Sequence, residues 1–454
     1  MILSMAEDLQ TVVTRLNTHL HSTYRTDTQL FEELKRVQSD LGLLYDDRPT
    51  CPLLRPHFLA RSQYDEIVYA AERIAEAEER LTYAALEDDD LRARLDLTEM
   101  EERLVKVDPG YDVISVTSRF DTFVSGNDFK FLEYNAETPA GVGDQTPLET
   151  VLGHIPLVNE FLNNHANWKP KPHQMLLRSL FTSYREFGGR KKKPNIAIID
   201  WDGVSTEAEF YILKEYFESM GFRTLVVDPA EVEYNGEQLH ASSFEIDILY
   251  KRILVHELLE EFDDTHPVIT AYEDGNLCMC NSFRVKIPHK KASFAILTDP
   301  KYASIFTSEQ LEMIDRHIPW TRKVEDAKTK FRGEEGDLLE LLRKNREKFL
   351  IKPNDDYGGK GIVLGWESGQ AEWETAIDNS LTDSFVVQER AAIEKLEFPL
   401  FDKKQVFMEK LLVDFDPFLF QNRVEGGMVR LSSSSLVNIT QGGGQTALVV
   451  LEDF

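Results

Sequence analysis

The most informative pattern of apolar and polar positions lies between residues 349 and 365. An apolar run at 349–351 leads into a polar stretch at 352–361, and a second apolar run follows at 362–364. Short apolar runs on both sides of a glycine-containing loop predict two strands joined by a flap. This flap is therefore the first candidate for a binding function.

Four residues of the flap favour a polyphosphate ligand. Gly358, Gly359 and Gly361 would let backbone N–H groups approach phosphates without an intervening Cβ, and Lys352 adds a mobile positive charge. Walker loops and dinucleotide fingerprints open a helix, whereas here a strand follows. A tight hairpin that uses glycine only for turn geometry would have the same sequence, so the rest of the chain must decide between a nucleotide site and a simple turn.

Helical periodicity dominates the first part of the chain, and we expect a helical N-terminal region over residues 1–110. Its clearest helix begins near Ser62, a predicted N-cap with Asp65 three residues later. The apolar positions behind this cap recur at helical spacing: Ile67, Ala70, Ile74, Ala77 and Leu81. The acidic run at 87–90 predicts a solvated face.

A strand pattern replaces the helical one near residue 113. Apolar alternation predicts strands at 113–117, 119–124 and 129–135, and the last two flank a Ser-Gly-Asn-Asp turn. A three-residue loop at 126–128 would pair Asp121 with Glu133 and Arg119 with Asn135. This hairpin and the helices after it make up the predicted segment 111–187.

The two opposed carboxylates of this hairpin predict a cation between them. Strand alternation puts Glu133 and Asn135 on one face, with Lys130, Leu132 and Tyr134 on the other. Carboxylates that face each other across a ladder destabilise it unless a positive charge intervenes, and oxygen ligands of this kind suit Mg²⁺. The alternative is that Asp121 and Glu133 point to solvent and pair with lysines.

A basic, glycine-containing linker at 188–194 precedes a predicted β-α-β unit over residues 194–280. Strands are expected at 195–200, 224–229 and 246–250, which indicates a small doubly wound domain. Its first turn lacks Gly-x-Gly-x-x-Gly, so a nicotinamide or flavin dinucleotide is not indicated. The remaining residues, 281–454, read as a larger α+β unit.

Four features of this C-terminal unit are candidates for the site. Lys290 and Lys291 precede an apolar helix-like run, and the strand at 386–391 ends in a turn whose amides could hold an adenine edge. A hairpin is predicted over 417–431 with its turn at 425–427. The loop at 441–445 either closes over a substrate or merely turns.

Composition and charge narrow the function classes. At 454 residues the chain has length for about three domains. Its 79 acidic residues outnumber 51 basic ones for a formal charge of −28, which argues against nucleic acid or an anionic membrane as the main partner. Three cysteines cannot complete a four-thiolate zinc site. No secretory signal or long apolar run is visible, and we expect a cytoplasmic protein.

Together these stretches resemble the ATP-grasp superfamily, specifically the circularly permuted branch that includes the synthetase domain of glutathionylspermidine synthase. The resemblance spans roughly residues 110–445, and the spacing from Asp121 to Glu133 is its most specific part. The stretches that carry it are 119–121, 133–139, 289–292, 351–361, 387–391 and 427–430. In most ATP-grasp proteins the acidic metal ligands come at the end of the fold, so their early position here indicates the permutation.

The resemblance implies an ATP-grasp fold, ATP and Mg²⁺ (two ions) as cofactors, and a role for each matching residue. Asp121, Glu133 and Asn135 would hold the metal, and Arg119 and Arg430 would stabilise the transition state. Lys352 and Lys291, with Lys290 as the alternative, would contact phosphates. Gly358, Gly359 and Gly361 would cover the phosphates, and adenine would be held by Gln388, Glu389, Arg390 and Ala391. The family's chemistry is phosphorylation of a carboxylate, followed by capture of the acyl phosphate by an amine.

One departure leaves the substrates open. The bifunctional synthases carry an amidase domain with a cysteine nucleophile, and the first hundred residues here show no Cys/His pair. Substrate contacts are expected from Thr138, Arg252 and the turn at 201–206. Two other functions remain possible: an ATP-dependent phosphotransferase, and a non-catalytic ATP-binding regulatory or scaffold protein. Retention of the metal ligands and both arginines favours an active enzyme. The oligomeric state is left open.

Overall fold

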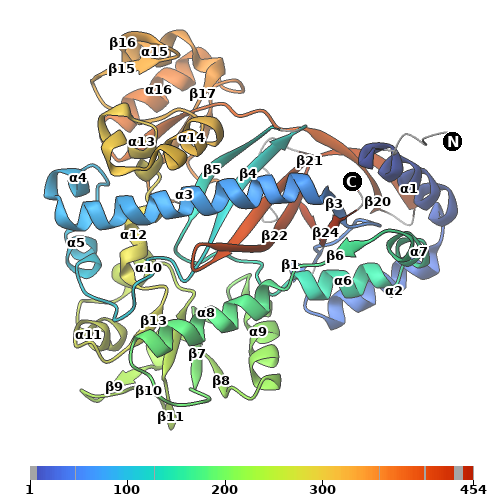
Figure 1. Ribbon diagram of the computed structural model, residues 1–454, viewed down its shortest axis with the longest axis horizontal. Helices are drawn as coiled ribbons and strands as arrows, with labels where there is room; N and C mark the ends of the chain where they lie inside the picture. Colours follow the sequence, from blue (N-terminus) through green and yellow to red (C-terminus); the bar gives the residue numbers. More distant parts are fainter. Residues whose placement is uncertain are drawn as a thin grey trace.

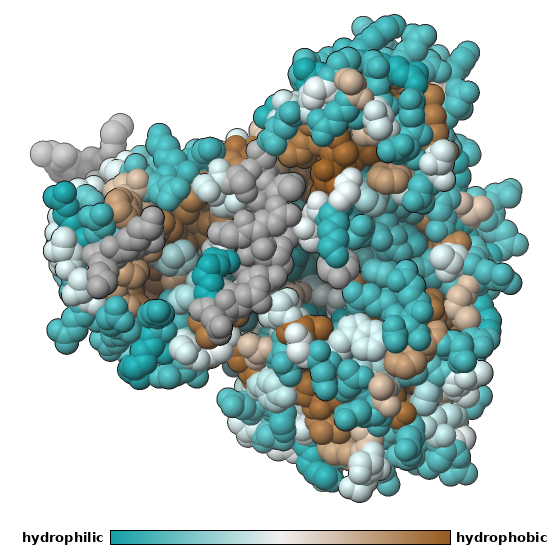
Figure 2. Space-filling view, turned by 180° about the vertical axis from the view of Figure 1, so that it is seen from behind, coloured by the Kyte–Doolittle hydropathy of each residue, from teal (hydrophilic) through white to brown (hydrophobic). Residues whose placement is uncertain are grey.

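The computed structural model describes residues 8–45, 48–126, 128–356, 358–402, 405–433, 443–452 and 454. Helices and sheets are mixed along the chain, as the sequence predicted. Three lobes surround the middle of the molecule, with the long helix α3 (Arg61–Glu87) running across it (Figure 1). Figure 2 shows the opposite face, where hydrophilic side chains cover most of the surface. In the part of the chain described, no helix is long and apolar enough to cross a membrane.

The largest sheet is antiparallel and combines strands from distant parts of the chain. Its strand order is β23-β22-β21-β4-β5, and β20 also pairs with β21. The strands are β4 (Thr117–Ser125), β5 (Asp128–Asn135), β20 (Lys395–Asp402), β21 (Gln405–Phe420), β22 (Arg423–Ser432) and β23 (Gly444–Thr446). An early hairpin thus lies beside the late strands (Figure 1).

N-terminal helices share one apolar core with this sheet. The helices are α1 (Leu9–Tyr24), α2 (Thr28–Asp40), α3, α4 (Asp89–Ala93) and α5 (Glu99–Val105), joined by α6 (Gln145–Gly153) and α7 (Pro156–Asn164). The residues of this core are spread along the sequence from Val13 to Leu451. Helix α3 begins at Arg61 and has Ala60 at its N-cap without a side-chain bond, so the predicted Ser62 cap is wrong.

Short strands also tie the two ends of the chain together. Strand β24 (Leu448–Leu451) pairs in parallel with β3 (His57–Ala60) and antiparallel with β6 (Asn167–Trp168). A two-stranded ladder joins β1 (Leu44–Tyr45) to β2 (Arg48–Pro49). The four-segment division predicted above stays a prediction.

The predicted β-α-β unit is present as a parallel sheet of order β13-β12-β7-β8. The strands are β7 (Ile196–Ile199), β8 (Thr224–Val227), β12 (Ile248–Lys251) and β13 (Cys278–Cys280). The helices are α8 (Pro172–Glu186), α9 (Glu207–Ser219), α10 (Val255–Glu261), α11 (Pro267–Glu273) and a 3-10 turn at Pro229–Glu231. A side sheet holds β9 (Glu233–Tyr234), β10 (Leu239–Ala241) and β11 (Phe244–Glu245). The sequence did not predict β13, whose cysteines are buried and free.

The flap belongs to a third sheet with its own core, of order β14-β19-β17-β18. Its strands are β14 (Thr321–Lys323), β17 (Phe349–Pro353), β18 (Val363–Leu364) and β19 (Phe385–Glu389), with the hairpin β15 (Lys328–Phe331) and β16 (Glu334–Asp337) beside it. Its helices are α12 (Lys286–His289), α13 (Ala292–Leu297), α14 (Ser308–His317), α15 (Leu338–Lys344) and α16 (Gln370–Ser380), with 3-10 turns at Phe283–Val285, Pro300–Ile305 and Arg346–Lys348. Ile351 pairs with Val363, which confirms the strand, flap, strand prediction.

The β4–β5 hairpin has the predicted register but a different turn. Ser125 pairs with Asp128, so the loop is one residue shorter than expected. A bulge restores the register, because Thr122 pairs with Phe131 while Asp121 pairs with Glu133, and Leu132 is the extra residue. Leu132 and Glu133 consequently both line the same cavity, which corrects the strict alternation predicted for this strand.

The turn of the β21–β22 hairpin also differs from the prediction. The chain reverses at Gln421 and Asn422, whose φ values of 50° and 61° are left-handed, and not at 425–427. Gly427 lies inside β22, where a Cβ would come within 2.5 Å of the Asp416 carbonyl oxygen. Gly427 therefore serves close packing of the two strands, whereas Gly426 packs against Pro170. Of the predicted loop at 441–445, residues 441 and 442 lie outside the described residues.

Candidate functional site

A cavity of about 530 Å³ collects most of the residues predicted for the site. It is bordered by the β4–β5 hairpin, the flap, the first turn of the parallel sheet, and strands β22 and β23. The predicted residues that line it are Arg119, Asp121, Glu133, Asn135, Thr138, Arg252, Lys352, Gly358, Gly359 and Arg430. The cavity therefore unites segments from the largest sheet, the parallel sheet and the flap sheet.

Asp121 is held by two arginines and an amide. Its Oδ1 accepts from Arg119 Nη2 at 2.9 Å and from Asn135 Nδ2 at 2.7 Å, and its Oδ2 accepts from Arg430 Nη2 at 2.7 Å. Burial alone would raise the pKa of Asp121, but the charges of Arg119 and Arg430 outweigh burial and hold it well below its usual range. This carboxylate is ionised at neutral pH.

Two buried aspartates that the sequence analysis missed complete the surroundings of Arg430. Its Nη2 lies 2.7 Å from Asp414 Oδ2 and 2.8 Å from Asp416 Oδ2, and Asp414 faces it directly across the β21–β22 ladder. Burial raises the pKa of Asp414 to about 6 and that of Asp416 well above its usual range. One sequence signal could have revealed them: aspartates two residues apart in an otherwise apolar strand need a buried partner.

Lys352 carries a buried ammonium group that has few polar partners among the described residues. It is 5% exposed, and its Nζ donates to the carbonyl oxygen of Leu132 at 3.2 Å. That oxygen belongs to the bulged residue and also accepts from Gln388 Nε2 at 3.1 Å. Burial lowers the pKa of Lys352 to about 8, against the opposing effect of the Glu133 carboxylate. An anion in the cavity would stabilise the charged form.

The two candidate lysines before α13 point in different directions. Lys291 Nζ donates to the carbonyl oxygen of Asp356 at 2.6 Å and lies 3.7 Å from Glu133 Oε2. Lys290 instead is buried between Glu101, at 3.0 Å, and Asp355, at 2.5 Å. Of the two, Lys291 is the lysine beside the predicted metal ligands.

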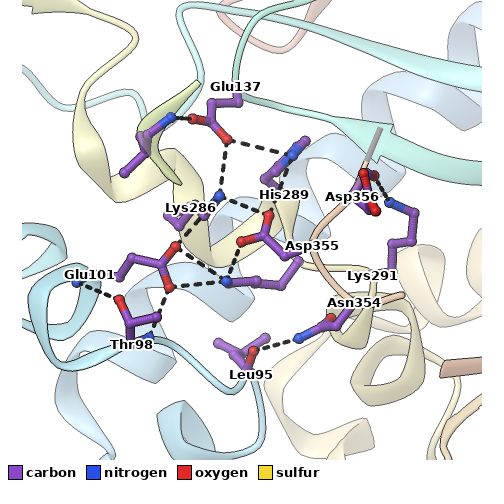
Figure 3. A network of polar contacts seen from close by, with 12 residues as sticks. Leu95, Thr98, Glu101, Glu137, Lys286, His289, Lys291, Asn354, Asp355 and Asp356 are labelled. Atoms are coloured by element: carbon purple, nitrogen blue, oxygen red, sulfur yellow. Dashed lines mark hydrogen bonds and ion pairs between the residues drawn. The ribbon is translucent and has the colours of Figure 1, made fainter. Parts of the chain in front are cut away.

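Asp355, at the base of the flap, belongs to a buried ion network drawn in Figure 3. Its Oδ1 lies 2.7 Å from Lys286 Nζ, which also lies 3.3 Å from Glu137 Oε2. Three carboxylates face three ammonium groups here: Glu101, Glu137 and Asp355 against Lys251, Lys286 and Lys290. Burial lowers the pKa of the adjacent His289 to about 4, so this network is electrically balanced at neutral pH.

Asn354, next to Asp355, holds the start of the flap against residues 291 and 292 by hydrogen bonds, and we call these contacts the clasp. Asn354 Oδ1 accepts from the Ala292 amide at 2.8 Å, and the Asn354 carbonyl accepts from the Lys291 amide at 3.0 Å. Beyond the clasp, Gly358 and Gly359 line the cavity with φ values of 69° and 76°. Gly361 does not line it but packs against Pro353, where a Cβ would come within 2.7 Å of Cγ.

The segment predicted to hold adenine lies beside the cavity and not in its lining. Gln388 is 2% exposed and uses its amide on Leu132 and Thr321, while Glu389, Arg390 and Ala391 border a neighbouring hollow. The amides of Glu389 and Arg390 already donate to the carbonyls of Trp320 and Lys348, at 2.8 and 2.7 Å. A ligand would have to replace these bonds to use either amide.

The end of the cavity beside the parallel sheet contains the predicted substrate residues. Arg252 is 5% exposed; its Nη1 donates to the carbonyl oxygen of Pro139 at 2.6 Å, and its Nη2 lies 3.5 Å from Glu209 Oε2. Thr138 and the turn at 201–206 line this end as well. Its carboxylates are Asp144, Asp200, Glu209 and Glu257. Burial raises the pKa of Asp200 to about 6.

Two of the three predicted metal ligands, Glu133 and Asn135, have the chemistry to bind Mg²⁺ without losing an arginine partner. Glu133 and Asn135 line the cavity and carry hard oxygen atoms, and Asn135 Nδ2 donates to Asp121 Oδ1 at 2.7 Å and to Glu133 Oε1 at 3.5 Å. To bind the ion, Asp121 would have to give up its hydrogen bonds to Arg119 or to Arg430. Among the residues described, no group of three or more His, Cys, Asp or Glu side chains is arranged to hold a metal.

Comparison with known proteins gives structural neighbours alone. No protein-family model matches the chain, and no curated protein matches it. A glutathione synthetase-like effector from Globodera pallida superposes over 98% of both chains, with 12% identity and a TM-score of 0.60. A putative gamma-glutamylcysteine synthetase from Methylobacillus flagellatus has a TM-score of 0.45 at 12% identity, over 86% of this chain and 89% of that one. D-alanyl-alanine synthetase A from Vibrio cholerae has a TM-score of 0.28 at 11% identity, over 53% and 89%.

The first of these likenesses extends over nearly the whole chain and establishes the fold. The chain is mixed α/β, as the sequence predicted, and it has the fold of the glutathione synthetase-like effector.

Proposed function

We propose that this protein is an ATP-dependent ligase that joins a carboxylate to an amine through an acyl phosphate, with release of ADP and phosphate. The observation that carries this proposal is the meeting of Lys352, two glycines of the flap (Gly358 and Gly359), and the pair Arg119 and Arg430 in one cavity. Phosphoryl transfer depends on alignment and charge neutralisation more than on a covalent nucleophile. The fold shared with a synthetase-like protein supports the same reaction class.

The lysines and glycines would bind the phosphates of ATP. The Lys352 ammonium is buried with a single carbonyl acceptor among its described contacts, so it gains a strong interaction when an anion enters. Lys291 would approach the same phosphates from α13. The N–H groups around Gly358 and Gly359 would cover them.

Glu133 and Asn135 would hold Mg²⁺, and Asp121 would join them if it exchanged a guanidinium. Bound there, the metal would neutralise phosphate charge. The hard oxygen donors of these side chains support this assignment. The roles given to Gln388, Glu389, Arg390 and Ala391 at the adenine stay part of the proposal.

Arg119 and Arg430 would stabilise the negative charge that develops when the carboxylate attacks the γ-phosphate. Both guanidiniums lie within hydrogen-bond distance of Asp121, so their positions are fixed before any substrate binds. The carboxylate oxygen forms the new P–O bond, and ADP leaves with the electrons of the bond that breaks. The carboxylate carbon thereby becomes open to attack by the amine.

We also propose the circular permutation and the specific resemblance to glutathionylspermidine synthase. In support, the hairpin with Asp121 and Glu133 precedes the lysine strand in sequence yet pairs with β21 from the C-terminal part. The acid and the amine are not identified by this resemblance. Thr138 and Arg252 are the residues we propose for contacts with them.

The test is ADP release from the purified protein with Mg-ATP and pooled amino acids, small peptides, glutathione and polyamines. We expect release that requires one acid and one amine together. Glu133→Gln serves as the inactive comparison, because Glu133 lines the cavity without the arginine pairs that hold Asp121. Glu347→Gln, at an exposed position outside the cavity, should behave as the unchanged protein.

Two outcomes would contradict the ligase. ADP release that needs only a hydroxyl or phosphate acceptor would identify a phosphotransferase. Tight ATP binding with no release from any pool would identify a nucleotide-binding regulatory protein.

A further inference from the structure

One corner of the cavity presents hydrogen-bond acceptors that the proposed ATP site does not use. Asp144, just before α6, and Gln445, in β23, both line the cavity, and Gln445 Nε2 donates to Asp144 Oδ2 at 3.0 Å. The same nitrogen donates to Thr50 Oγ1 at 3.0 Å. Gln445 is 3% exposed, so its amide is fixed and holds the carboxylate of Asp144 in place.

The oxygen atom of the Gln445 side-chain amide suggests that a ligand binds in this corner. This atom, Oε1, is buried and accepts no hydrogen bond from any described residue. An unsatisfied buried acceptor is costly, so a ligand that donates an N–H to it would be stabilised. The adjacent carboxylate oxygen accepts a second N–H. Two converging acceptors favour an amine over a carboxylate or a phosphate.

Strand register brings this corner next to the catalytic arginines. Gln445 faces Arg430 across the β22–β23 ladder, and paired residues project on the same face with Cβ atoms about 5 Å apart. On the other side, Arg119 Nη1 donates at 3.0 Å to the carbonyl oxygen of Ala140, four residues before Asp144 in the chain. The acceptor corner therefore adjoins the place where the carboxylate would be activated.

The charges around Asp144 suit proton transfer. Burial raises the pKa of Asp144 to about 7, and the carboxylate of Glu209 on α9 adds to the rise. The hydrogen bond from Gln445 and the charge of Arg252, which follows β12, oppose it. Such a carboxylate is partly ionised at neutral pH and takes up a proton readily.

We propose that Asp144 and Gln445 bind the attacking amine and that Asp144 is its general base, an inference that rests on the proposed ligase function. An amine that arrives as an ammonium ion first releases one proton to water. The nitrogen lone pair then forms the C–N bond, and the C–O bond to phosphate breaks with its electron pair on the departing phosphate. The proton lost by nitrogen goes to Asp144, while Gln445 Oε1 accepts the remaining N–H.

The test separates formation of the acyl phosphate from its capture. N-acetylated amino acids and peptides supply carboxylates without a free amine, and either hydroxylamine or amino-acid amides supply the nucleophile. Hydroxylamine is a reactive, neutral nucleophile that needs no base. We expect Asp144→Asn to retain hydroxamate formation and to lose about 10²–10⁴-fold in amide formation.

The pH profile supplies the readout that a structural role would not move. Amide formation by the unchanged protein should fall below pH about 7, where Asp144 becomes protonated, and hydroxamate formation should lack this fall. Asp144→Glu should restore part of the amide rate. Gln445→Leu, which keeps the base, should raise KM for the amine. Glu160→Gln, exposed on α7, is the matched control and should change nothing.

Three results have different meanings. Undiminished amide formation by Asp144→Asn would overturn the inference. Equal loss of hydroxamate and amide, in a variant with an unchanged circular dichroism spectrum, would also overturn it, because the base acts after the acyl phosphate forms. Absence of both products with the unchanged protein would overturn the proposed function itself.

Discussion

At the scale of single residues, the buried ammonium of Lys352 is the strongest indication of an anionic ligand. The described residues give it one carbonyl acceptor, and burial lowers its pKa to about 8. A charge in this position is stabilised far more by a phosphate than by a carbonyl dipole. ATP binding and protonation of Lys352 should therefore favour each other.

The affinity for ATP should weaken as pH rises through about 8, because the free protein then loses the Lys352 proton that the phosphates need. Lys352→Met should remove this pH dependence and weaken binding about 10–100-fold, the loss of one charge-assisted hydrogen bond. Isothermal titration calorimetry at pH 7 and pH 9 measures both effects. Lys344→Met, at an exposed lysine of α15, is the control. Parallel pH profiles for the Lys352 and Lys344 variants would contradict the assignment.

Which site residues could be predicted depended on their distance along the chain. Asp121 and Glu133 were predictable because they oppose each other within one hairpin. Asp414 and Asp416 meet Arg119 and Asp121 only through pairing of β21 with β4, strands almost 300 positions apart, so no local pattern could place them there. Their only local signal was the pair of acidic residues in an apolar strand.

At the scale of elements, the sequence predicted the correct residue pairs around Asp121 in the β4–β5 ladder although the predicted turn length was wrong. The expected loop was one residue too long, and the bulge at Leu132 compensated. Strand periodicity determines which residues can face each other, whereas bulges depend on neighbours in other strands. For the same reason, the Glu-Gly-Gly run at 425–427 suggested a turn, although Gly427 lets β22 pack closely on β21 and Gly426 packs against Pro170.

The ion network at the base of the flap should be worth more to stability than a surface pair. Asp355→Asn leaves the three buried ammonium groups facing only two carboxylates, Glu101 and Glu137, so the free energy of unfolding should drop by about 3 kcal/mol. The neighbouring lysines hold the pKa of Asp355 well below its usual range despite burial, so this stabilisation is present above pH about 4 and lost as pH falls further. Urea unfolding at several pH values measures it.

The matched control for this change is Asp378→Asn, whose 68%-exposed carboxylate pairs with Arg343. It should alter stability by less than about 1 kcal/mol. The Asp355 variant should also bind ATP more weakly, since the clasp positions the flap. Equal urea midpoints for the two variants would exclude a stabilising role for the network.

At the scale of the whole molecule, one apolar core joins the N-terminal helices to the last strands. It contains residues of α1 and α3 together with those of β4, β5 and β24. Composition and periodicity predicted the mixed α/β class and the parallel sheet, because those follow from local patterns. They could not predict that residues 1–110 share a core with residues of the segments 111–187 and 281–454, since apolar faces do not specify their partners.

Removal of residues 1–110 should therefore leave a chain that does not unfold cooperatively. The shortened chain would expose the apolar positions that now contact α1 and α3, including those of β4 and β5. Differential scanning calorimetry and limited proteolysis compare it with the complete chain. A single sharp transition for residues 111–454 would show that the helical region is an independent domain.

The bulge at Leu132 has a consequence for how this protein can change over generations. One carbonyl oxygen accepts both Lys352 and Gln388, so the acidic hairpin and the flap sheet meet at a single backbone atom. Loss of that one codon would straighten the ladder and remove the shared acceptor. Side-chain substitution at the same position would leave it untouched. The shared acceptor should therefore survive side-chain substitution at this position but not the insertion or deletion of a residue.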